Sequence, residues 1–253
     1  MKYTRQELMI VAAAREIQNH QTVFVGTGLP MLAGYLAKAT HAPESTLLFE
    51  AGIVDPKPRH LASGVGDFRL MSGAVAVKGL YYALGLLQGG HVDLGFLGAG
   101  EVDQYGNINS TFVGGTYKKP KKRLPGSGGA NDIASLAKAT VIIVPHTTRK
   151  LVKRVQYITT PGYLNGKGAR EAAGLTRGGP KRIITDLAVL GFDPNTLTVR
   201  VESIHEGVTE EDIRKNSGFD IPIIRNCPKT KPPSSYELEL IRSFDPDGVY
   251  LKR

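Results

Sequence analysis

A glutamate at the end of a short apolar run is the residue of this sequence best suited to chemistry. Glu50 follows the run Leu47–Phe49 directly, and Ala51 and Gly52 come next. The apolar run predicts a strand, and the glycine lets the chain turn at once. We expect a carboxylate held there to be partly desolvated, which favours its reaction as a nucleophile. Three roles are open: a surface ion pair, a clamp for a nucleotide ribose, and a nucleophile with small neighbours that leave room for a substrate.

The ribose clamp has partial support from an upstream glycine pair. Gly26 and Gly28 follow another predicted strand, and Glu50 comes about 20 residues later, as in dinucleotide-binding proteins. However, Met31 stands where the third glycine of that motif is needed for close helix–strand packing. Pro30 also removes an amide that could face a pyrophosphate. Binding of a nicotinamide or flavin cofactor is therefore disfavoured.

A second glycine turn has the composition of an anion-binding loop. The stretch PGSGGAND, residues 125–132, places Gly126, Gly128 and Gly129 before a helix predicted to begin at Asn131 or Asp132. Backbone N–H groups in such a turn can bind an anion or stabilise a developing oxyanion. Many loops are rich in glycine, so this stretch alone does not define a function.

The charge of the chain favours anionic partners. The formal net charge is +9 and most of the excess is dispersed, but Lys118–Arg123 reads KKPKKR. This run is either a nucleic-acid patch or a solvated loop. We expect the solvated loop, because no aromatic platform and no recognition helix accompany the run.

Composition places the chain among ordinary globular proteins. It has 253 residues, 41% of them hydrophobic, and a single cysteine, Cys227, so no intrachain disulfide is expected. The cysteine and histidine spacing gives no metal motif, so we expect no metal. The charges in residues 1–20 argue against a signal peptide, and no apolar stretch is long enough to span a membrane. We therefore expect one domain over residues 1–253 in a cytoplasmic protein.

Strand and helix patterns alternate along the chain and predict an α/β fold. Strands are expected within residues 22–25, 45–52, 92–100, 139–146, 181–193 (in part a hairpin) and 198–207, and helices within 4–14, 31–40, 74–90 (after a short apolar run) and 209–217. This order predicts an open, mainly parallel sheet with helices on both faces. Ligands bind such sheets at the carboxyl ends of the strands. Glu50, Gly26–Gly28 and the trio Gly98, Ala99 and Gly100 all fall at such ends.

Over nearly its whole length the sequence resembles the β subunits of the family I coenzyme A transferases, most closely those of the glutaconate CoA-transferase type. No single motif carries the resemblance, which depends on the combination and its order. The matching stretches are VGTGLP, FEAGIVD, GVGDFRLM, GAGEVDQYGNINST, GSGGAND, TTPGYLNGKGAREAAGL, ITDLAVLGFD and NSGFD. The resemblance implies the three-layer α/β/α fold of these enzymes, which is also found in NagB- and RpiA-like proteins.

The family's Glu-x-Gly signature matches Glu50-Ala51-Gly52, and its glutamate is the covalent nucleophile. The resemblance implies a ping-pong reaction through an acyl-glutamyl anhydride and a glutamyl-CoA thioester on Glu50. Coenzyme A is then a substrate and covalent intermediate, and no permanently bound cofactor is implied. Water must be excluded, because the anhydride would otherwise hydrolyse.

Other site residues follow from the same resemblance. The amides of Gly128, Gly129 and Ala130 match the family's glycine loop near the reacting carbonyl, and Gly98, Ala99 and Gly100 are expected to line the same cleft. Asn107 and Asn109 match a recurrent stretch, although stabilisation of a turn explains them equally well. The resemblance further implies an α subunit that completes the site, in a heterodimer that can dimerise again. Lys118–Arg123 is a candidate to attract CoA phosphates or an acidic partner chain.

Three alternatives to CoA transfer stay open. Relatives with this fold act as decarboxylases of CoA thioesters or as hydrolases, but those lack a glutamate at the position of Glu50. A basic nucleic-acid-binding protein that uses Lys118–Arg123 is the remote alternative, and our prediction is that neither nucleic acid nor a membrane is a partner. The carboxylic acid that exchanges CoA is expected to be a dicarboxylate such as glutaconate. The sequence of this chain does not identify which dicarboxylate it is.

Overall fold

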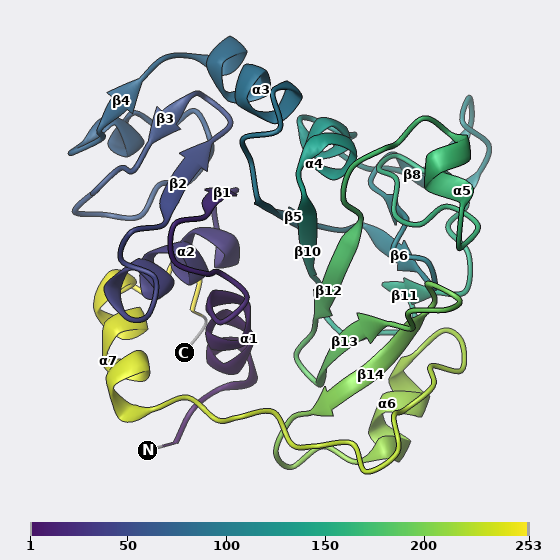
Figure 1. Ribbon diagram of the computed structural model, residues 1–253. Coiled ribbons are helices and arrows are strands. Elements are labelled where there is room, and N and C mark those ends of the chain that lie inside the picture. Colours follow the sequence, from purple (N-terminus) through teal and green to yellow (C-terminus); the bar gives the residue numbers. More distant parts are fainter. Residues whose placement is uncertain (1, 252–253) are drawn as a thin grey trace. The chain divides into compact units, whose positions relative to one another are not determined.

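The computed structural model describes residues 2–251 and divides the chain into two compact units (Figure 1). The first unit extends to Leu97 and resumes at Pro232, and the second comprises Gly98–Lys231. Each unit is described by itself. A single domain over residues 1–253 stays a prediction.

The first unit contains a mixed sheet with the strand order β5-β1-β2-β3-β4. Its elements are α1 (Arg5–Ala14), β1 (Thr22–Phe24), α2 (Leu29–Ala39), β2 (Thr46–Phe49), β3 (Ile53–Val54), the 3₁₀ helix η1 (Phe68–Met71), β4 (Ala76–Val77), α3 (Leu80–Gln88), β5 (Leu94–Gly98) and α7 (Ser235–Phe244). β1 pairs in parallel with β2 and β5, whereas β3 pairs antiparallel with β2 and β4. The parallel strands thus end at one common edge.

Two helices of the first unit are joined by a partly buried ion pair. Thr4 and Glu7 form the capping box expected at the start of α1. Glu7 is also buried, and its carboxylate accepts a 2.7 Å bond from Nε of Arg242 on α7. Burial by itself raises the pKa of Glu7, but the bonds from Arg242 and Thr4 outweigh it and lower that pKa. The C-terminal helix is therefore attached to the first helix, with α2 packed against both.

The second unit holds three smaller sets of strands. Its elements are β6 (Glu101–Asp103), β7 (Ile108–Asn109), β8 (Phe112–Gly115), β9 (Pro120–Arg123), α4 (Ala130–Leu136), β10 (Ala139–Ile143), β11 (Leu151–Val152), α5 (Ala169–Ala172), β12 (Pro180–Ile184), β13 (Ala188–Phe192), β14 (Val199–Ile204) and α6 (Glu210–Asn216). β10 pairs in parallel with β12, and β12, β13 and β14 follow one another antiparallel. β11, β6 and β7 form a second sheet, and β8 pairs with β9.

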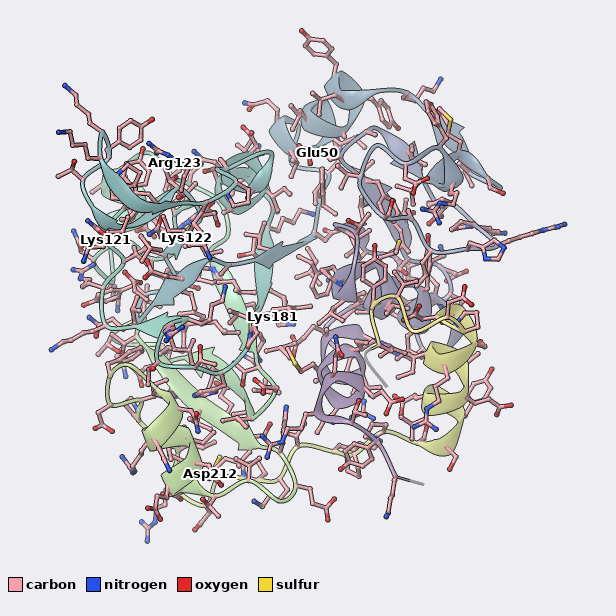
Figure 2. All side chains as sticks on the ribbon, turned by 180° about the vertical axis from the view of Figure 1, so that it is seen from behind. Glu50, Lys121, Lys122, Arg123, Lys181 and Asp212 are labelled. Atoms are coloured by element: carbon pink, nitrogen blue, oxygen red, sulfur yellow. The ribbon has the colours of Figure 1, made fainter. Side chains whose placement is uncertain are left out.

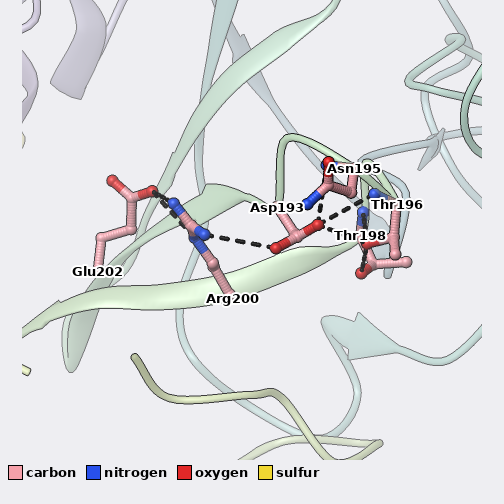
Figure 3. Close-up of polar contacts among 6 residues, drawn as sticks. All are labelled: Asp193, Asn195, Thr196, Thr198, Arg200 and Glu202. Atoms are coloured by element: carbon pink, nitrogen blue, oxygen red, sulfur yellow. Dashed lines mark hydrogen bonds and ion pairs between the residues drawn. The ribbon is translucent and has the colours of Figure 1, made fainter. Parts of the chain in front are cut away.

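The expected hairpin near residue 190 is confirmed, and a polar network fixes the turn that follows it (Figure 3). The Asp193 carboxylate accepts the amides of Asn195 and Thr196 at 2.9 and 3.0 Å. These bonds, from Thr196 first, lower the pKa of Asp193. Arg200 on β14 lies 3.5 Å from Asp193 and 3.3 Å from Glu202. The network therefore aligns the ends of β13 and β14, which explains the conformation without any role in catalysis.

The structure corrects the interpretation of the basic run Lys118–Arg123 in two respects. Four of its residues form strand β9, so the run is not a plain solvated loop. The amides of Thr116 and Lys119 each donate to the other's carbonyl, at 3.2 and 3.1 Å, so the chain reverses between these two residues. β9 therefore pairs with β8 although Lys and Pro disfavour strands. The expectation that no aromatic platform accompanies the run is also wrong, because Tyr117 stacks on Tyr157.

Within residues 2–251, no helix is long and apolar enough to cross a membrane. In the same residues, no three or more His, Cys, Asp and Glu side chains are grouped so that they could hold a metal ion.

Candidate active site

Glu50 lies in the tight turn that joins β2 to β3, in the first unit (Figure 2). The amide of Gly52 donates to the carbonyl of Phe49 at 2.8 Å and closes the turn around Glu50 and Ala51. Glu50 is half-buried, so its carboxylate is neither sealed in the core nor fully solvated. Because β1 and β2 are parallel, Glu50 occupies the same sheet edge as Gly28, the residue that precedes α2.

Asp55 fixes the base of this hairpin. Its Oδ1 atom accepts a hydrogen bond from the amide of Leu47 at 2.8 Å and forms an ion pair with Lys38 at 3.0 Å. Its own amide donates to the carbonyl of Leu47 at 2.8 Å. Asp55 thus bridges β2 to α2 and holds the turn that carries Glu50. The sequence reasoning assigned Asp55 no role, although it closes the stretch FEAGIVD, because the bonds depend on Lys38 from a separate helix.

Gly52 is in direct backbone contact with the start of α3. A Cβ atom built on Gly52 would lie 2.0 Å from the carbonyl oxygen of Gly79, the residue that caps α3. Gly52 also has a φ of +76°, and its carbonyl accepts the amide of Lys78 at 3.0 Å. Only glycine allows this approach, so the Glu-x-Gly spacing ties the glutamate turn to α3.

A largely apolar face extends from that contact. Phe68, Val75 and Tyr81 are 81%, 75% and 94% exposed, and Met71, Val77, Leu80 and Tyr82 are exposed as well. Six of these seven residues lie on η1, β4 and α3, and Val75 directly precedes β4. We call these seven residues the η1–α3 face. Large apolar side chains exposed together are typical of a surface that a partner covers.

In the second unit, the trio Gly98, Ala99 and Gly100 forms the link from β5 to β6. Gly100 packs against β7, since a Cβ atom there would lie 2.4 Å from the carbonyl oxygen of Asn109. Lys150 donates from Nζ to the carbonyl of Ala99 at 2.9 Å. Burial, followed by the charge of nearby Lys122, lowers the pKa of Lys150. Lys150 fixes this link and was not anticipated, because nothing in its local sequence points to Ala99.

The two glycines of this link give a matched test of the geometry. We expect Gly100→Ala to destabilise the protein by about 2–3 kcal/mol, because the clash is with backbone. A loss of this size lowers Tm by roughly 5–10 °C in a chain of this length. Gly98→Ala should leave Tm within a degree or two, since a Cβ at Gly98 meets no atom within 4 Å. Thermal melts followed by circular dichroism measure both, and equal Tm values for the two variants would contradict the assigned packing.

The glycine turn before α4 is more specific than its composition suggested. α4 begins at Ala130, one residue earlier than expected. The Ala130 amide donates to the carbonyl of Ser127 at 3.0 Å, and the Asn131 amide donates to Oγ of Ser127 at 3.1 Å. Gly128 is exposed with a φ of +49°, and its amide has no hydrogen-bond partner among residues 2–251. Of the predicted donors Gly128, Gly129 and Ala130, the amide of Gly128 is thus available to a ligand, and that of Ala130 already has a partner.

Asn107 and Asn109 are fully buried and hydrogen-bonded within the second unit. Oδ1 of Asn107 accepts the amides of Gly162 and Leu164 at 2.9 and 3.0 Å. Nδ2 of Asn109 donates at 2.7 Å to Glu101 and to the carbonyl of Phe112. These contacts support turn stabilisation, the second of the two interpretations.

The fold and the position of Glu50 define an α/β enzyme with its candidate carboxylate at a strand end, and comparison with known families identifies the class. The chain belongs to the coenzyme A transferase family, whose model, "Coenzyme A transferase", matches residues 6–216.

Two curated relatives match almost the full chain. The B subunit of 3-oxoadipate CoA-transferase from Pseudomonas knackmussii is 40% identical over 96% of this chain and 94% of its own length. The B subunit of glutaconate CoA-transferase from Acidaminococcus fermentans is 34% identical over 99% of this chain and 96% of its own.

Solved structures confirm the predicted fold class. A chain of the crystal structure of the Acidaminococcus fermentans enzyme superposes with a TM-score of 0.92, at 32% identity, over 100% of this chain and 98% of its own. A chain of the decarboxylase AibA/AibB superposes with a TM-score of 0.84, at 28% identity, over 98% of both chains.

Proposed function

We propose that this chain is the β subunit of a two-chain CoA-transferase that moves CoA between an acyl-CoA and a dicarboxylic acid through a covalent intermediate on Glu50. Membership of the family supports CoA as a substrate. The observation that carries the covalent step is the half-buried Glu50 in a turn with small neighbours, at the end of a parallel strand. A carboxylate so placed is accessible to a thioester and partly protected from water.

The proposed reaction consists of reversible exchanges at carbonyl carbon. A carboxylate oxygen of Glu50 attacks the acyl-CoA thioester, so that a C–O bond forms, the C–S bond breaks and CoA leaves as a thiolate. The thiolate then attacks the glutamyl carbonyl of the anhydride, which gives a Glu50–CoA thioester and releases the first acid. The acceptor carboxylate runs these steps in reverse and leaves as its CoA thioester. A glutamate suits this sequence because its anhydride keeps the acyl group activated.

Each attack produces an oxyanion, and we assign its donor to the turn before α4 because that turn resembles the family's glycine loop. The amide of Gly128 is the donor that we assign to this role, since the Ala130 amide is already bonded to Ser127. A backbone N–H aimed at the developing charge lowers the barrier without reorganisation. We also assign Gly129 and the trio Gly98, Ala99 and Gly100 to the CoA site, whereas Asn107 and Asn109 hold loops of the second unit.

The names of the two curated relatives support a proposal for the class of acid. The two curated relatives are named for 3-oxoadipate and glutaconate, and both compounds are dicarboxylic acids. We therefore propose a dicarboxylate of five or six carbons as one substrate. The decarboxylase AibA/AibB shares the fold, so decarboxylation of a CoA thioester is the second candidate function. Release of CO₂ from a CoA thioester without CoA transfer would show that the chain takes part in decarboxylation instead.

A partner chain is part of the proposal. Both curated relatives are B subunits by name, which supports an α subunit as the partner of this chain. We assign the η1–α3 face to that contact, because it adjoins the glutamate turn through Gly52 and Gly79. A partner seated there would bury apolar side chains and also exclude water from the carboxylate of Glu50.

Tyr81→Asp tests this contact. A charge placed where a 94% exposed ring meets the partner should weaken the α–β complex by about 2–4 kcal/mol, or roughly 30- to 1,000-fold in Kd. Sedimentation velocity of the two co-expressed chains measures the change. Tyr236→Asp is the matched control, since Tyr236 is an exposed tyrosine of the same unit on α7. Equal dissociation of both variants would show that the η1–α3 face is not the contact.

The function is tested with the chain co-expressed with its α subunit. Incubation with acyl-CoA donors should give CoA attached to the peptide that contains Glu50, detected by mass spectrometry after rapid quenching. Glutaconate and 3-oxoadipate are then added separately, and formation of their CoA thioesters is followed. If neither a Glu50 adduct nor transfer occurs with any donor, the proposed function is wrong.

A further inference from the structure

The β8–β9 hairpin of the second unit carries a concentrated positive charge. Its cations are exposed, and within residues 2–251 none of them pairs with a carboxylate; they are Lys118, Lys119, Lys121, Lys122 and Arg123. Figure 2 shows Lys121, Lys122 and Arg123 together on this hairpin. Unpaired cations this close repel one another, so an anion bound there relieves the repulsion.

Aromatic rings accompany the charge. Tyr117 and Tyr157 stack with centroids 5.9 Å apart and planes 30° from parallel, and they stay 57% and 41% exposed. Phe112 packs beside them with centroids 6.0 and 5.8 Å away. The Arg123 guanidinium lies 5.0 Å from the centre of the Tyr117 ring. An exposed ring next to a guanidinium is a surface on which a nucleobase can stack.

The hairpin is held in place and leads into the glycine turn. The side chain of Gln156 accepts the amide of Gly114 at 3.0 Å and donates to the carbonyl of Gly115 at 2.6 Å, so β8 is fixed to the segment that carries Tyr157. Beyond β9, the Gly126 amide donates to the carbonyl of Ser110 at 2.7 Å. Only about five residues separate Arg123 from Gly128, a span of at most about 18 Å.

We propose that the β8–β9 hairpin binds the phosphorylated nucleotide end of coenzyme A, with the lysines on its phosphates and Tyr117 or Tyr157 under its adenine. This inference rests on the proposed function. It assigns the positive charge of the hairpin to the binding of the phosphates of CoA. CoA carries a diphosphate and a 3′-phosphate at one end and its thiol at the other, joined by an extended pantetheine arm. The arrangement places phosphate-binding cations on one side of the glycine turn and the Gly128 amide within it.

The test compares substrates with and without the nucleotide, using the complex with the α subunit. For the double variant Lys121→Gln/Lys122→Gln we expect KM for the acyl-CoA to rise about tenfold, with kcat within about twofold. For the corresponding acyl-pantetheine, which lacks the nucleotide, wild type and variant should have the same KM. The control Lys2→Gln/Lys215→Gln removes the same charge from exposed lysines elsewhere and should leave both KM values unchanged.

Calorimetry separates this inference from the proposed function. Titration of the complex with CoA should show about tenfold weaker binding for the hairpin variant and for Tyr117→Ala, whether or not the complex turns over. If the complex transferred no CoA but the variants still bound CoA about tenfold more weakly, only the proposed function would be overturned. Unchanged CoA affinity in the hairpin variant, or an equal KM increase with acyl-pantetheine, overturns the hairpin assignment. If the hairpin variant lost binding to RNA or DNA but kept its affinity for CoA, the hairpin assignment would be wrong as well.

Discussion

Replacing Glu50 with glutamine is expected to abolish CoA transfer and to leave the fold intact. Glutamine has nearly the same shape, but its neutral amide oxygen is a poor nucleophile and cannot form the anhydride. Because the proposed route passes through a covalent bond to this side chain, kcat should fall by at least about a thousandfold. Transfer assays with the α–β complex measure the loss, and mass spectrometry should find no CoA on the variant.

The matched control is Glu44→Gln, which changes an exposed glutamate just before the same strand. Glu44 bonds to Asn19 and His20 at the surface, and it precedes β2 whereas the β2–β3 turn follows it. Its substitution should leave kcat within about twofold, as is usual for surface sites. Glu50→Ala tests the side chain without the amide and should be as inactive as Glu50→Gln. A Glu50→Gln complex with near wild-type transfer would remove the covalent mechanism.

Features encoded locally were predictable from the sequence. The capping boxes at Thr4 and Thr209 are confirmed, because both partners of each bond lie within one helical turn. The strands β1, β2, β5 and β10 were expected from apolar runs that are bounded by glycine, proline or polar residues. Glu50 was found in the same way, since a strand, an acid and a glycine are contiguous in the sequence.

Elements defined by distant pairing were not predictable. β11 has only Leu151 and Val152, and it is a strand because it pairs with Val102 and Asp103. β9 consists of proline and cations, whose intrinsic preference opposes a strand, and the pairing with β8 overrides that preference. The helix α7 was missed for a different reason, because its capping box at Ser234 is local and went unrecognised.

The side chains that hold the candidate site in place also depend on distant contacts, so they were not predictable from the sequence. Nothing next to Asp55 indicates that it binds Lys38, and nothing next to Lys150 indicates that it holds the carbonyl of Ala99. Sequence reasoning thus located the candidate nucleophile but not the side chains that position its surroundings. The same limit explains why the ring of Tyr157 was not associated with the basic run, since the two lie in different segments.

The contact between Gly52 and Gly79 leads to the second large effect. We expect Gly52→Ala to lower kcat by at least about a hundredfold although Glu50 is unchanged. A methyl group on Gly52 would lie 2.0 Å from the carbonyl oxygen of Gly79, and the positive φ of Gly52 adds strain of about 1–2 kcal/mol. Either the glutamate turn or the start of α3 must shift, and a shift of about 1 Å is enough for a loss of this size.

The matched control is Gly85→Ala, within α3 itself. A Cβ on Gly85 meets no atom within 4 Å, and alanine is the better helix former by about 1 kcal/mol, so this variant should be fully active and at least as stable. Thermal melts and sedimentation of the α–β complex show whether Gly52→Ala still folds and assembles. If it does and transfer is lost, the position of the turn limits the reaction. Full activity in folded Gly52→Ala would mean that Glu50 does not depend on the contact with α3.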